Sequence, residues 1–302
     1  MKRINIELSQ STMYWYELLV SNFQDFDTPK LIKDDLKKQK KELNSNFKKH
    51  FIYFICSRKK IRFDITKKIK KVWFKDKVRI PLIIGKEKKK TSIDITFIDR
   101  ATGKFTLPKI DLYDKFITIH DLDGNKESYP IHNFLEKMGL DIGFPSKVEY
   151  VGYTMNPDTR PTNGAHTGLS DALYKTDNDD VDILLYFNTF NTICTSNQNG
   201  VDVSVENAKA KWLSVKDEGF FIEKSFIFYF DSVNQFRNKE NESKELINLL
   251  KKFKSRNKID NVLFYYEFIR DTEYWELTST KCLPTRSHRF KVSLNGGKWQ
   301  IT

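Results

Sequence analysis

The sequence predicts an α+β fold in which a small mixed or antiparallel sheet is flanked by helices. Three observations predict it. Apolar residues recur at broadly helical intervals through residues 30–57, after a proline at a favourable first-turn position. From Ile61 onward the pattern changes to an alternation with a period of two, which is typical of short strands. Hydrophobic residues make up 39% of the 302 residues and aromatic residues 14%, which is enough to build a packed core.

The elements follow from these periodicities and from the turn residues between them. We predict helices over residues 11–22, 30–57, 131–138, 169–174, 208–215, 220–230 and 243–253. The predicted strands span residues 61–65, 72–74, 78–80, 92–98, 104–107, 115–121, 147–154, 183–188, 262–269, 274–277, 290–294 and 299–301. Residues 100–103 give a hairpin signal, Pro81 limits strand pairing in its neighbourhood, and the lysines of residues 86–90 fall in a loop between strands.

Cysteine usage and the apolar runs exclude several classes of protein. The three cysteines are far apart and show no CxxC spacing, which argues against a disulfide framework or a zinc site and fits a reducing, cytoplasmic compartment. The longest apolar run, residues 51–56, is too short to span a bilayer, so we expect no membrane partner. No secretory signal is recognised at the N-terminus. The sequence leaves the oligomeric state open, a homodimer included.

The formal net charge of +12 is spread unevenly along the chain. Residues 1–110 carry a net +16, residues 111–240 carry −9 and residues 241–302 carry +5. We therefore predict a basic nucleic-acid-binding region over 1–110, a catalytic domain over 111–240, and a C-terminal module of a helix plus strands over 241–302. Basic flanks attract a polyanion by counterion release, without sequence specificity. The alternative is a lysine-rich proteome, which would inflate such counts.

Lysines of the basic region are interleaved with the aromatic residues Trp73 and Phe74. This pattern suits a surface that contacts phosphates and stacks on bases. The alternative is a two-faced strand with its aromatics in the core and its lysines in water, and we expect this alternative to hold for most of the aromatics. The lysines that we expect to contact nucleic acid are Lys67, Lys68, Lys70, Lys71, Lys75, Lys77, Lys86, Lys88, Lys89 and Lys90.

One ordered set of residues carries chemistry. Tyr150 lies in a predicted strand, and Arg160 and His166 follow it after a turn. Far downstream, Glu223 lies in an apolar helix that Asn234 follows. Phenol, guanidinium, imidazole, carboxylate and amide together suit metal-assisted cleavage of a phosphodiester bond. Each residue also has a plainer structural interpretation: a core aromatic, a solvated loop arginine, a helix cap, a first-turn carboxylate and a helix end.

The order of these residues resembles that of the GIY-YIG nuclease family. Tyr150-Val151-Gly152 resembles the second half of the motif for which the family is named, and Thr154, Arg160 and His166 resemble the residues that follow it. Glu223, the apolar run after it and Asn234 resemble the helix that carries the metal-binding glutamate and ends near an asparagine. The resemblance covers residues 115–240 and implies a GIY-YIG-like catalytic domain.

The first motif of the family, Gly-Ile-Tyr, has no match in the strand expected to carry it. That strand contains Phe116-Ile117-Thr118-Ile119-His120, without a tyrosine. Its distance from the second motif implies an insertion around residues 126–146. The candidates to replace the missing phenol are Tyr113, Tyr129, Tyr153 and His120.

The resemblance implies a divalent-metal-dependent endonuclease that hydrolyses DNA phosphodiester bonds. Glu223 would hold Mg²⁺ or Mn²⁺, Arg160 would clamp the phosphate, and Tyr150 or His166 would accept a proton from the attacking water. Asn234 would orient the phosphate or fix the glutamate. Restriction and antiphage defence are among the implied roles, and RNA is an alternative substrate. Two other interpretations stay open: a catalytically inactive nucleic-acid-binding relative, and an interaction or toxin-like module with an acidic protein partner.

Overall fold

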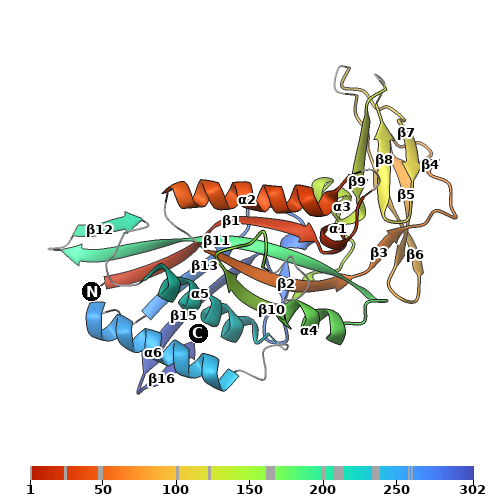
Figure 1. Ribbon diagram of the computed structural model, residues 1–302. Coiled ribbons are helices and arrows are strands. Elements are labelled where there is room, and N and C mark those ends of the chain that lie inside the picture. Colours follow the sequence, from red (N-terminus) through yellow and green to blue (C-terminus); the bar gives the residue numbers. More distant parts are fainter. Residues whose placement is uncertain are drawn as a thin grey trace.

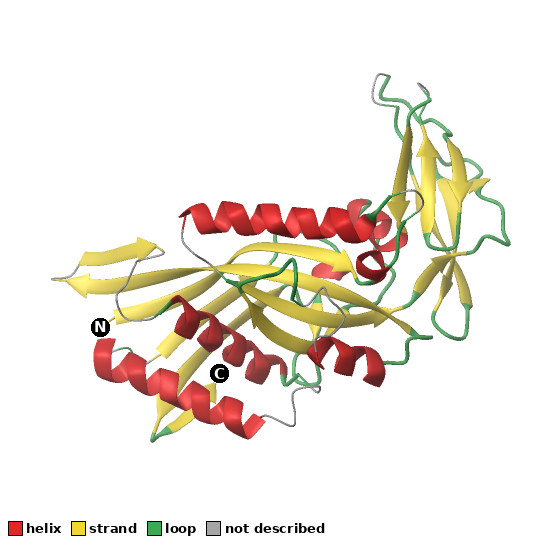
Figure 2. Cartoon of the chain, in the orientation of Figure 1, coloured by secondary structure: helices red, strands yellow, loops and turns green. Residues whose placement is uncertain are grey.

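The fold is α+β, with 27% of the residues helical and 43% in strands, as predicted. The computed structural model describes residues 2–23, 26–46, 50–99, 102–121, 124–160, 167–198, 201–206, 214–232, 239–257, 259 and 261–302. A long nine-stranded sheet forms the body, and two smaller sheets stand together at one of its ends (Figure 1; Figure 2). None of the helices in these ranges is long and apolar enough to cross a membrane.

The large sheet takes strands from each of the three regions that the charges distinguish. Its strands are β1 (Lys2–Trp15), β2 (Phe51–Lys59), β10 (Ser146–Thr154), β11 (Val181–Gln198), β12 (Val201–Glu206), β13 (Asn261–Glu267), β14 (Leu277–Thr278), β15 (Ser287–Asn295) and β16 (Lys298–Ile301). Their order is β14-β10-β2-β11-β1-β13-β15-β16, with β12 paired to β11. The β1–β13 and β10–β14 pairs are parallel and the others antiparallel. The division into functional regions stays a prediction.

Helices cover both faces of this sheet. One face packs against α1 (Glu17–Val20), α2 (Thr28–Asn46) and α4 (Thr167–Lys175), and the other against α5 (Val215–Phe230) and α6 (Lys239–Asn257) (Figure 1). Alternate residues of β2 follow this division: Phe51, Tyr53 and Ile55 join the α2 side, and Ile52, Phe54 and Cys56 join the α5 side. Because β2 is buried on both faces, its residues 51–56 form a continuous apolar run.

The two smaller sheets lie in the chain between β2 and β10. The first has four strands, β3 (Ile61–Phe63), β4 (Lys70–Lys71), β5 (Val78–Ile84) and β6 (Lys89–Ile95). In it β5 pairs with the other three strands. The second has the antiparallel strands β7 (Lys109–Leu112), β8 (Phe116–His120) and β9 (Lys126–Pro130), and α3 (Ile131–Lys137) follows directly.

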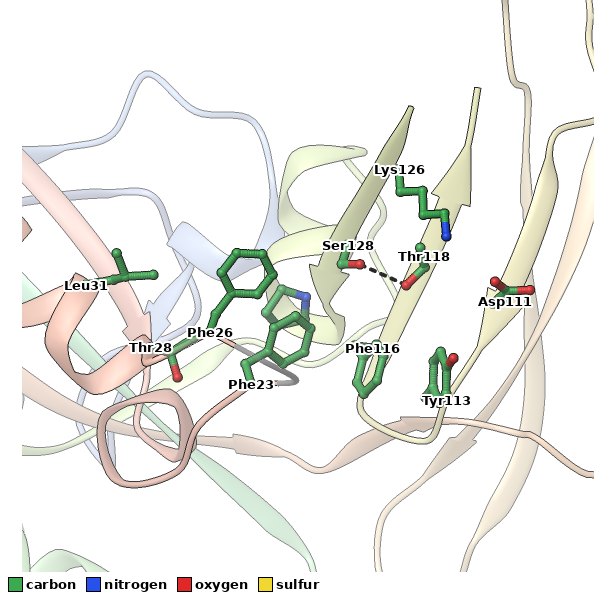
Figure 3. Close-up of a pocket in the computed structure, with 11 residues that line it drawn as sticks. Phe23, Phe26, Thr28, Leu31, Asp111, Tyr113, Phe116, Thr118, Lys126 and Ser128 are labelled. Carbon is green, nitrogen blue, oxygen red and sulfur yellow. Dashed lines mark hydrogen bonds between the residues drawn. The ribbon is translucent and has the colours of Figure 1, made fainter. Parts of the chain in front are cut away.

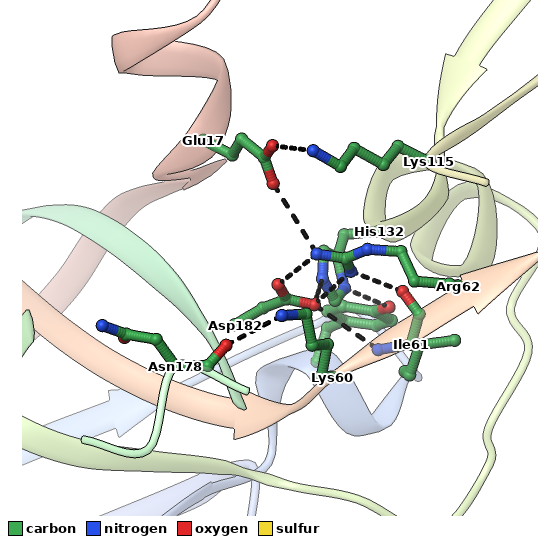
Figure 4. Close-up of polar contacts among 9 residues, drawn as sticks. Glu17, Lys60, Ile61, Arg62, Lys115, His132, Asn178 and Asp182 are labelled. Carbon is green, nitrogen blue, oxygen red and sulfur yellow. Dashed lines mark hydrogen bonds and ion pairs between the residues drawn. The ribbon is translucent and has the colours of Figure 1, made fainter. Parts of the chain in front are cut away.

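A buried polar cluster joins these small sheets to the large one (Figure 4). Asp182 of β11 accepts hydrogen bonds from His132 Nε2 of α3 at 2.9 Å and from Arg62 Nη1 of β3 at 2.7 Å. His132 Nδ1 lies 3.0 Å from the hydroxyl of Tyr274, and Arg62 also pairs with Glu17 at 3.6 Å. Burial acts to raise the pKa of Asp182, but the hydrogen bonds and charges of His132 and Arg62 hold it well below its usual range.

Two predicted helices are wrong where the chain instead pairs with β11. Residues 11–15, predicted as helix, belong to β1, and residues 51–57 belong to β2, which lies between β10 and β11. Both segments are rich in aromatic and β-branched residues, and their pairing in the sheet outweighs the local helical spacing. The prediction of a small sheet is wrong for the same reason, since these two strands complete a sheet of nine.

Three predicted strands also differ from the structure. Residues 72–74 form the turn between β4 and β5, and residues 104–107 contribute only one bridge, from Phe105 to Ile98. Residues 274–277 begin as the short 3-10 helix η2 (Glu273–Trp275) before β14. Pro81 did not limit β5, which continues to Ile84, and Lys89 and Lys90 lie in β6 rather than in a loop. The predicted helix at 208–215 falls largely outside the described residues.

Candidate active site

The register of β2 and β10 places two tyrosines at a glycine. Gly152 lies opposite Tyr53, and Tyr150 lies opposite Ile55 after a bulge at Glu149. A Cβ atom on Gly152 would lie 2.2 Å from Cζ and 2.3 Å from Oη of Tyr53. The absence of a side chain therefore gives the Tyr53 ring its place over the strand, where it stacks on Tyr150 with ring centroids 6.1 Å apart.

The two phenol groups of Tyr53 and Tyr150 are hydrogen-bonded to each other. Burial is the main reason that the pKa of Tyr150 is raised to about 12, and the negative charge of Glu223 adds to the shift. The hydrogen bond with Tyr53 and the charge of Arg160 act in the opposite direction. Burial also raises the pKa of Tyr53 well above its usual range. Of the two phenols, Tyr150 therefore has the lower pKa and loses its proton first.

Glu223 reaches β10 from α5. This helix begins after Ser214, whose hydroxyl accepts a hydrogen bond from the Asp217 amide at 3.0 Å. Close approach is possible because a Cβ on Gly219 would lie 2.2 Å from the Tyr153 ring. Glu223 follows Gly219 by one helical turn and accepts a hydrogen bond from the backbone N–H of Tyr153. Since β14 pairs with β10 only at Ser146 and Lys147, this contact lies on the outer edge of β10.

The surroundings of Glu223 favour its neutral form. Burial is the main cause that raises its pKa to about 8; the nearby Lys224 opposes the shift, whereas the negative charge of Glu242 adds to it. Lys224 itself forms ion pairs with Glu242 and with Glu245, the latter at 2.6 Å. A half-buried carboxyl group beside a second carboxylate fits a divalent cation, which takes oxygen ligands and drives the deprotonation of its ligand.

Among the described residues, no group of three or more His, Cys, Asp or Glu side chains is placed so that it could hold a metal ion. A site built on one carboxylate, as predicted from the sequence, does not require such a group. The donor set around Glu223 therefore remains compatible with one divalent cation that keeps several water ligands.

Arg160 lies near enough to the tyrosine pair for its charge to act on both phenols. The turn after β10 holds it, with the Arg160 amide donating to the Asn156 carbonyl at 2.9 Å, and Lys40 of α2 donates to the Asn156 side chain at 2.6 Å. Its side chain is exposed, yet its positive charge lowers the pKa values of Tyr53, Tyr150 and Glu223. An exposed guanidinium group beside a carboxyl group and two phenols is free to bind a phosphate as well.

Of the five site residues predicted from the sequence, the structure brings three together: Tyr150, Arg160 and Glu223. His166 and Asn234 lie outside the described residues. A different histidine, His50, lies directly before β2, with its Nδ1 atom 3.4 Å from the hydroxyl of Tyr153. Burial lowers the pKa of His50 to about 4, so its ring is neutral, and in the described part of the chain its Nε2 atom is left without a hydrogen-bond partner.

Sequence reasoning missed Tyr53. The strand expected beside Tyr150, at residues 116–120, is β8, which pairs with β7 and β9 in a separate sheet. His120 is engaged there with Asp111 at 2.7 Å, and Tyr113 and Tyr129 belong to the same sheet region. The signal that could have revealed Tyr53 is the run of residues 51–56, whose aromatic and β-branched composition favours a buried strand over the end of a lysine-rich helix.

Two hollows lie on the small sheets, away from the tyrosine pair in the chain. One, of about 780 Å³, lies between the start of α2 and the β7–β9 sheet, and four aromatic rings line it together with polar and charged side chains (Figure 3). In it Phe23 and Tyr113 both contact the ring of Phe116. The other hollow is basic and includes Lys67, Lys68, Lys70 and Lys90. All ten lysines predicted to contact nucleic acid are exposed.

The cluster at the edge of β10 thus combines two phenols, a guanidinium group and a half-buried carboxyl group. No family model, no curated protein and no solved structure matches the chain. What the site does has to be argued from the chemistry of these residues.

Proposed function

We propose that this protein is a divalent-metal-dependent endonuclease of GIY-YIG-like design that hydrolyses phosphodiester bonds in DNA. The observation that carries the proposal is the stacked pair of Tyr53 and Tyr150 on the α2 face, with Arg160 acting on it electrostatically and Glu223 reaching the outer edge of β10 from the α5 face. In this proposal Phe51-Ile52-Tyr53 stands where the first motif of the family would stand, beside Tyr150-Val151-Gly152. The insertion between the two motifs is then residues 60–145 rather than 126–146.

Glu223 would hold Mg²⁺ or Mn²⁺, which when bound stabilises the leaving oxygen and the charge that develops on the phosphate. Ionisation of Glu223 costs free energy in the metal-free protein, because its pKa is raised to about 8 by burial, with Glu242 adding to the effect. Cation binding and proton loss at this carboxyl group are therefore linked.

Arg160 would clamp the scissile phosphate. Its guanidinium group is permanently charged and offers a fork of donors that matches two phosphate oxygens. Because Arg160 is exposed and held by the turn at Asn156, it can meet a substrate that approaches the outer edge of β10. Its charge would oppose the negative charge that grows on the phosphate during attack by water.

Tyr150 would accept a proton from the attacking water in its phenolate form, after its own phenol proton has been lost to solvent. Its pKa of about 12 is too high for efficient proton transfer near neutral pH, and the negative charge of Glu223 is the second largest cause. A cation bound to Glu223 would compensate its negative charge and so remove this cause. The hydrogen bond with Tyr53 and the charge of Arg160 would then lower the pKa of Tyr150. A lower pKa enlarges the fraction of Tyr150 present as phenolate, which is the form that can accept a proton.

The test is a cleavage assay on supercoiled plasmid with Mg²⁺ or Mn²⁺, with EDTA as the metal-free reference. We expect wild-type protein to nick or linearise the plasmid, and Glu223→Gln and Arg160→Ala to lose at least about 100-fold in rate. Tyr53→Phe keeps the ring and removes the hydrogen bond to Tyr150, so a loss of about tenfold or more is expected. Matched controls are Glu87→Gln and Arg289→Ala, which alter exposed side chains elsewhere and should cut like wild type.

Cleavage that persists in both Glu223→Gln and Arg160→Ala would remove the assignment of the site. Salt-sensitive binding of DNA without any cleavage would favour the interpretation as a catalytically inactive binding protein. An RNA of the same sequence, tested in parallel, distinguishes the two nucleic acids as substrates.

A further inference from the structure

The four-stranded sheet of β3 to β6 has one apolar and one basic face. Alternate residues of β5, including Val78, Ile80 and Leu82, belong to the buried core. On the opposite face the register pairs Arg79 with Lys70 of β4 and with Asp94 of β6. This face is hollowed, with a volume of about 680 Å³, and the residues that line it are Lys67, Lys68, Lys70, Arg79, Pro81, Lys90, Thr91 and Ser92.

Charge in this hollow is strongly positive. Arg79 is engaged by Asp94 in two hydrogen bonds, of 2.7 Å from Nε and 2.8 Å from Nη2, which fix its guanidinium group on the sheet. The lysines of the hollow are exposed on three separate segments, the loop after β3, β4 and the start of β6. Together with the hydroxyl groups of Thr91 and Ser92 they offer donors suited to several phosphate groups in a row.

The hairpin that joins β4 to β5 carries two aromatic side chains at its tip. Trp73 is 84% exposed and Phe74 fully exposed, so the expectation that aromatics of this region lie in the core is wrong for both. Their ring centroids are 6.1 Å apart, and Lys71, Lys75 and Lys77 flank them in the chain. Large aromatic side chains that are left in water beside lysines form a surface whose apolar area is not covered by the described part of the chain.

The backbone at this tip is also unusual. Phe74 has φ of 60°, in the left-handed region that favours glycine and is uncommon for a bulky side chain. A glycine at this position would relieve the conformation at no cost in packing, since the Phe74 ring is fully exposed. A strained backbone that presents a solvent-exposed ring points to a role for that ring outside the folded chain.

We propose that the β4–β5 hairpin tip is a stacking element for nucleic-acid bases, and that the adjoining basic hollow holds the phosphates of the same strand. Trp73 and Phe74 offer flat faces that bind any base by stacking, and the lysines follow the backbone without reading sequence. The surface therefore suits a strand whose bases are accessible, either single-stranded or locally opened. The proposal rests on the proposed function only for the choice of DNA over other polyanions.

The shape of the basic surface favours a nucleic acid over an anionic membrane. The lysines line a hollow, and the planar surface of a bilayer does not enter a hollow, whereas the narrow backbone of a nucleic-acid strand does. Membrane binding is nevertheless measured as a competing outcome in the experiment below.

The experiment measures binding of the full chain to a fluorescent mixed-sequence oligonucleotide in EDTA, so that cleavage plays no part. We expect Trp73→Ala to weaken binding about 5- to 100-fold without a change in the slope of log affinity against log salt. The variant Lys67→Gln/Lys68→Gln/Lys70→Gln should lower that slope by roughly 0.7 for each lysine that contacts a phosphate. Phe74→Gly should raise the melting temperature and still weaken binding, a combination that a merely structural role would not produce.

Controls remove similar groups elsewhere. Ile269→Ala and Leu283→Ala each remove an exposed apolar side chain, and Lys37→Gln/Lys38→Gln/Lys41→Gln removes exposed charge from α2. Trp73→Phe should retain binding but lose the protection from acrylamide quenching that we expect the wild type to gain on binding. If Trp73→Ala and Phe74→Gly bind like wild type, or if phosphatidylserine vesicles protect Trp73 and oligonucleotides do not, the proposal is overturned.

The same measurements separate this proposal from the proposed function. Oligonucleotide binding that depends on Trp73, in a protein that does not cleave plasmid with Mg²⁺ or Mn²⁺, supports the stacking tip and removes the nuclease. Plasmid cleavage with unchanged binding by Trp73→Ala supports the nuclease and removes the stacking tip.

Discussion

Glu223 is the residue whose chemistry depends most on its surroundings. It accepts a backbone hydrogen bond from Tyr153, which favours the charged form, but burial and the nearby Glu242 outweigh this contact and raise its pKa to about 8. A carboxyl group with a raised pKa stabilises the fold most below its unfolded pKa, and this contribution is lost as pH rises through about 8. A bound divalent cation would reverse the balance at neutral pH.

This linkage predicts that metal affinity depends on pH. Below about pH 8 a proton competes with the cation for Glu223, so the apparent dissociation constant for Mn²⁺ should fall about tenfold for each pH unit from 6 to 8 and then level off. Isothermal titration calorimetry in buffers of different ionisation enthalpy measures both the affinity and the proton released. The Glu223→Gln variant should bind Mn²⁺ weakly at every pH. An affinity that is constant between pH 6 and 9 would contradict the assignment of Glu223 as the ligand.

Gly152 is the residue on which the tyrosine pair depends. We expect Gly152→Ala to lower the free energy of unfolding by about 1–3 kcal/mol, because its Cβ would overlap the Tyr53 ring, and to reduce cleavage by displacing the phenol. Chemical denaturation measures the first effect and the plasmid assay the second. Tyr53→Ala provides the matched control: the double variant should lose less stability than the sum of the single variants. Additive losses would show that Gly152 and Tyr53 do not meet.

At the scale of elements, the contact of α3 and β3 with β11 depends on buried charge. Asp182 is held by His132 and Arg62, and its pKa lies below the usual range. A depressed carboxyl pKa contributes stability that is present above the unfolded value and is lost as pH falls. The pKa of His132 is lowered chiefly by burial, which outweighs the opposing effect of Asp182, so protonation of this buried ring at low pH also destabilises the fold.

Replacing Asp182 should therefore show how much this contact contributes to the stability of the fold. We expect Asp182→Asn to lower the free energy of unfolding by about 3–5 kcal/mol at pH 7, because Arg62 and His132 lose their buried carboxylate and Arg62 keeps only its longer ion pair with Glu17. The difference from wild type should shrink below about pH 4, where Asp182 becomes protonated in the unfolded chain. Urea denaturation across pH 3–7 measures it. Asp94→Asn, at a more exposed ion pair, should change stability by less than about 1 kcal/mol. A difference that is constant with pH would contradict the role of the Asp182 charge.

The elements also show where sequence reasoning succeeds. Helices α3, α4 and α5 and strands β8, β10 and β11 were predicted near their observed positions, because each has a clear period or a turn signal at its end. Strand β2 was missed because it is buried on both faces and lacks the alternation that marks a strand. Strand β1 was missed because its partner β11 lies far away in the sequence. Tyr150, Arg160 and Glu223 were predicted to converge, but Tyr53 could be found only through the pairing of β2 with β10.

At the scale of the whole molecule, the basic face of the β3–β6 sheet and the tyrosine pair belong to different parts of one chain. Contacts made far from the reacting phosphate stabilise the bound substrate and the transition state equally. We expect Lys67→Gln/Lys68→Gln/Lys70→Gln to raise KM for a DNA substrate about tenfold at moderate salt and to leave kcat unchanged. Steady-state kinetics on a fluorogenic oligonucleotide measures both constants. The triple variant of α2, Lys37→Gln/Lys38→Gln/Lys41→Gln, serves as the control, and a fall in kcat at constant KM would contradict the expectation.

The pairing of β2 with β10 and β11 has a consequence for how the protein is made. Ser57 and Glu149, hydrogen-bonded across β2 and β10, are 92 residues apart in the sequence, and Asn188 bonds to Ile52 across 136 residues. During synthesis β2 therefore leaves the ribosome long before either neighbouring strand, and Glu223 follows later still. Loop closure over such separations is slow compared with local folding. If the site cuts DNA, the nascent chain is harmless until most of it has been translated.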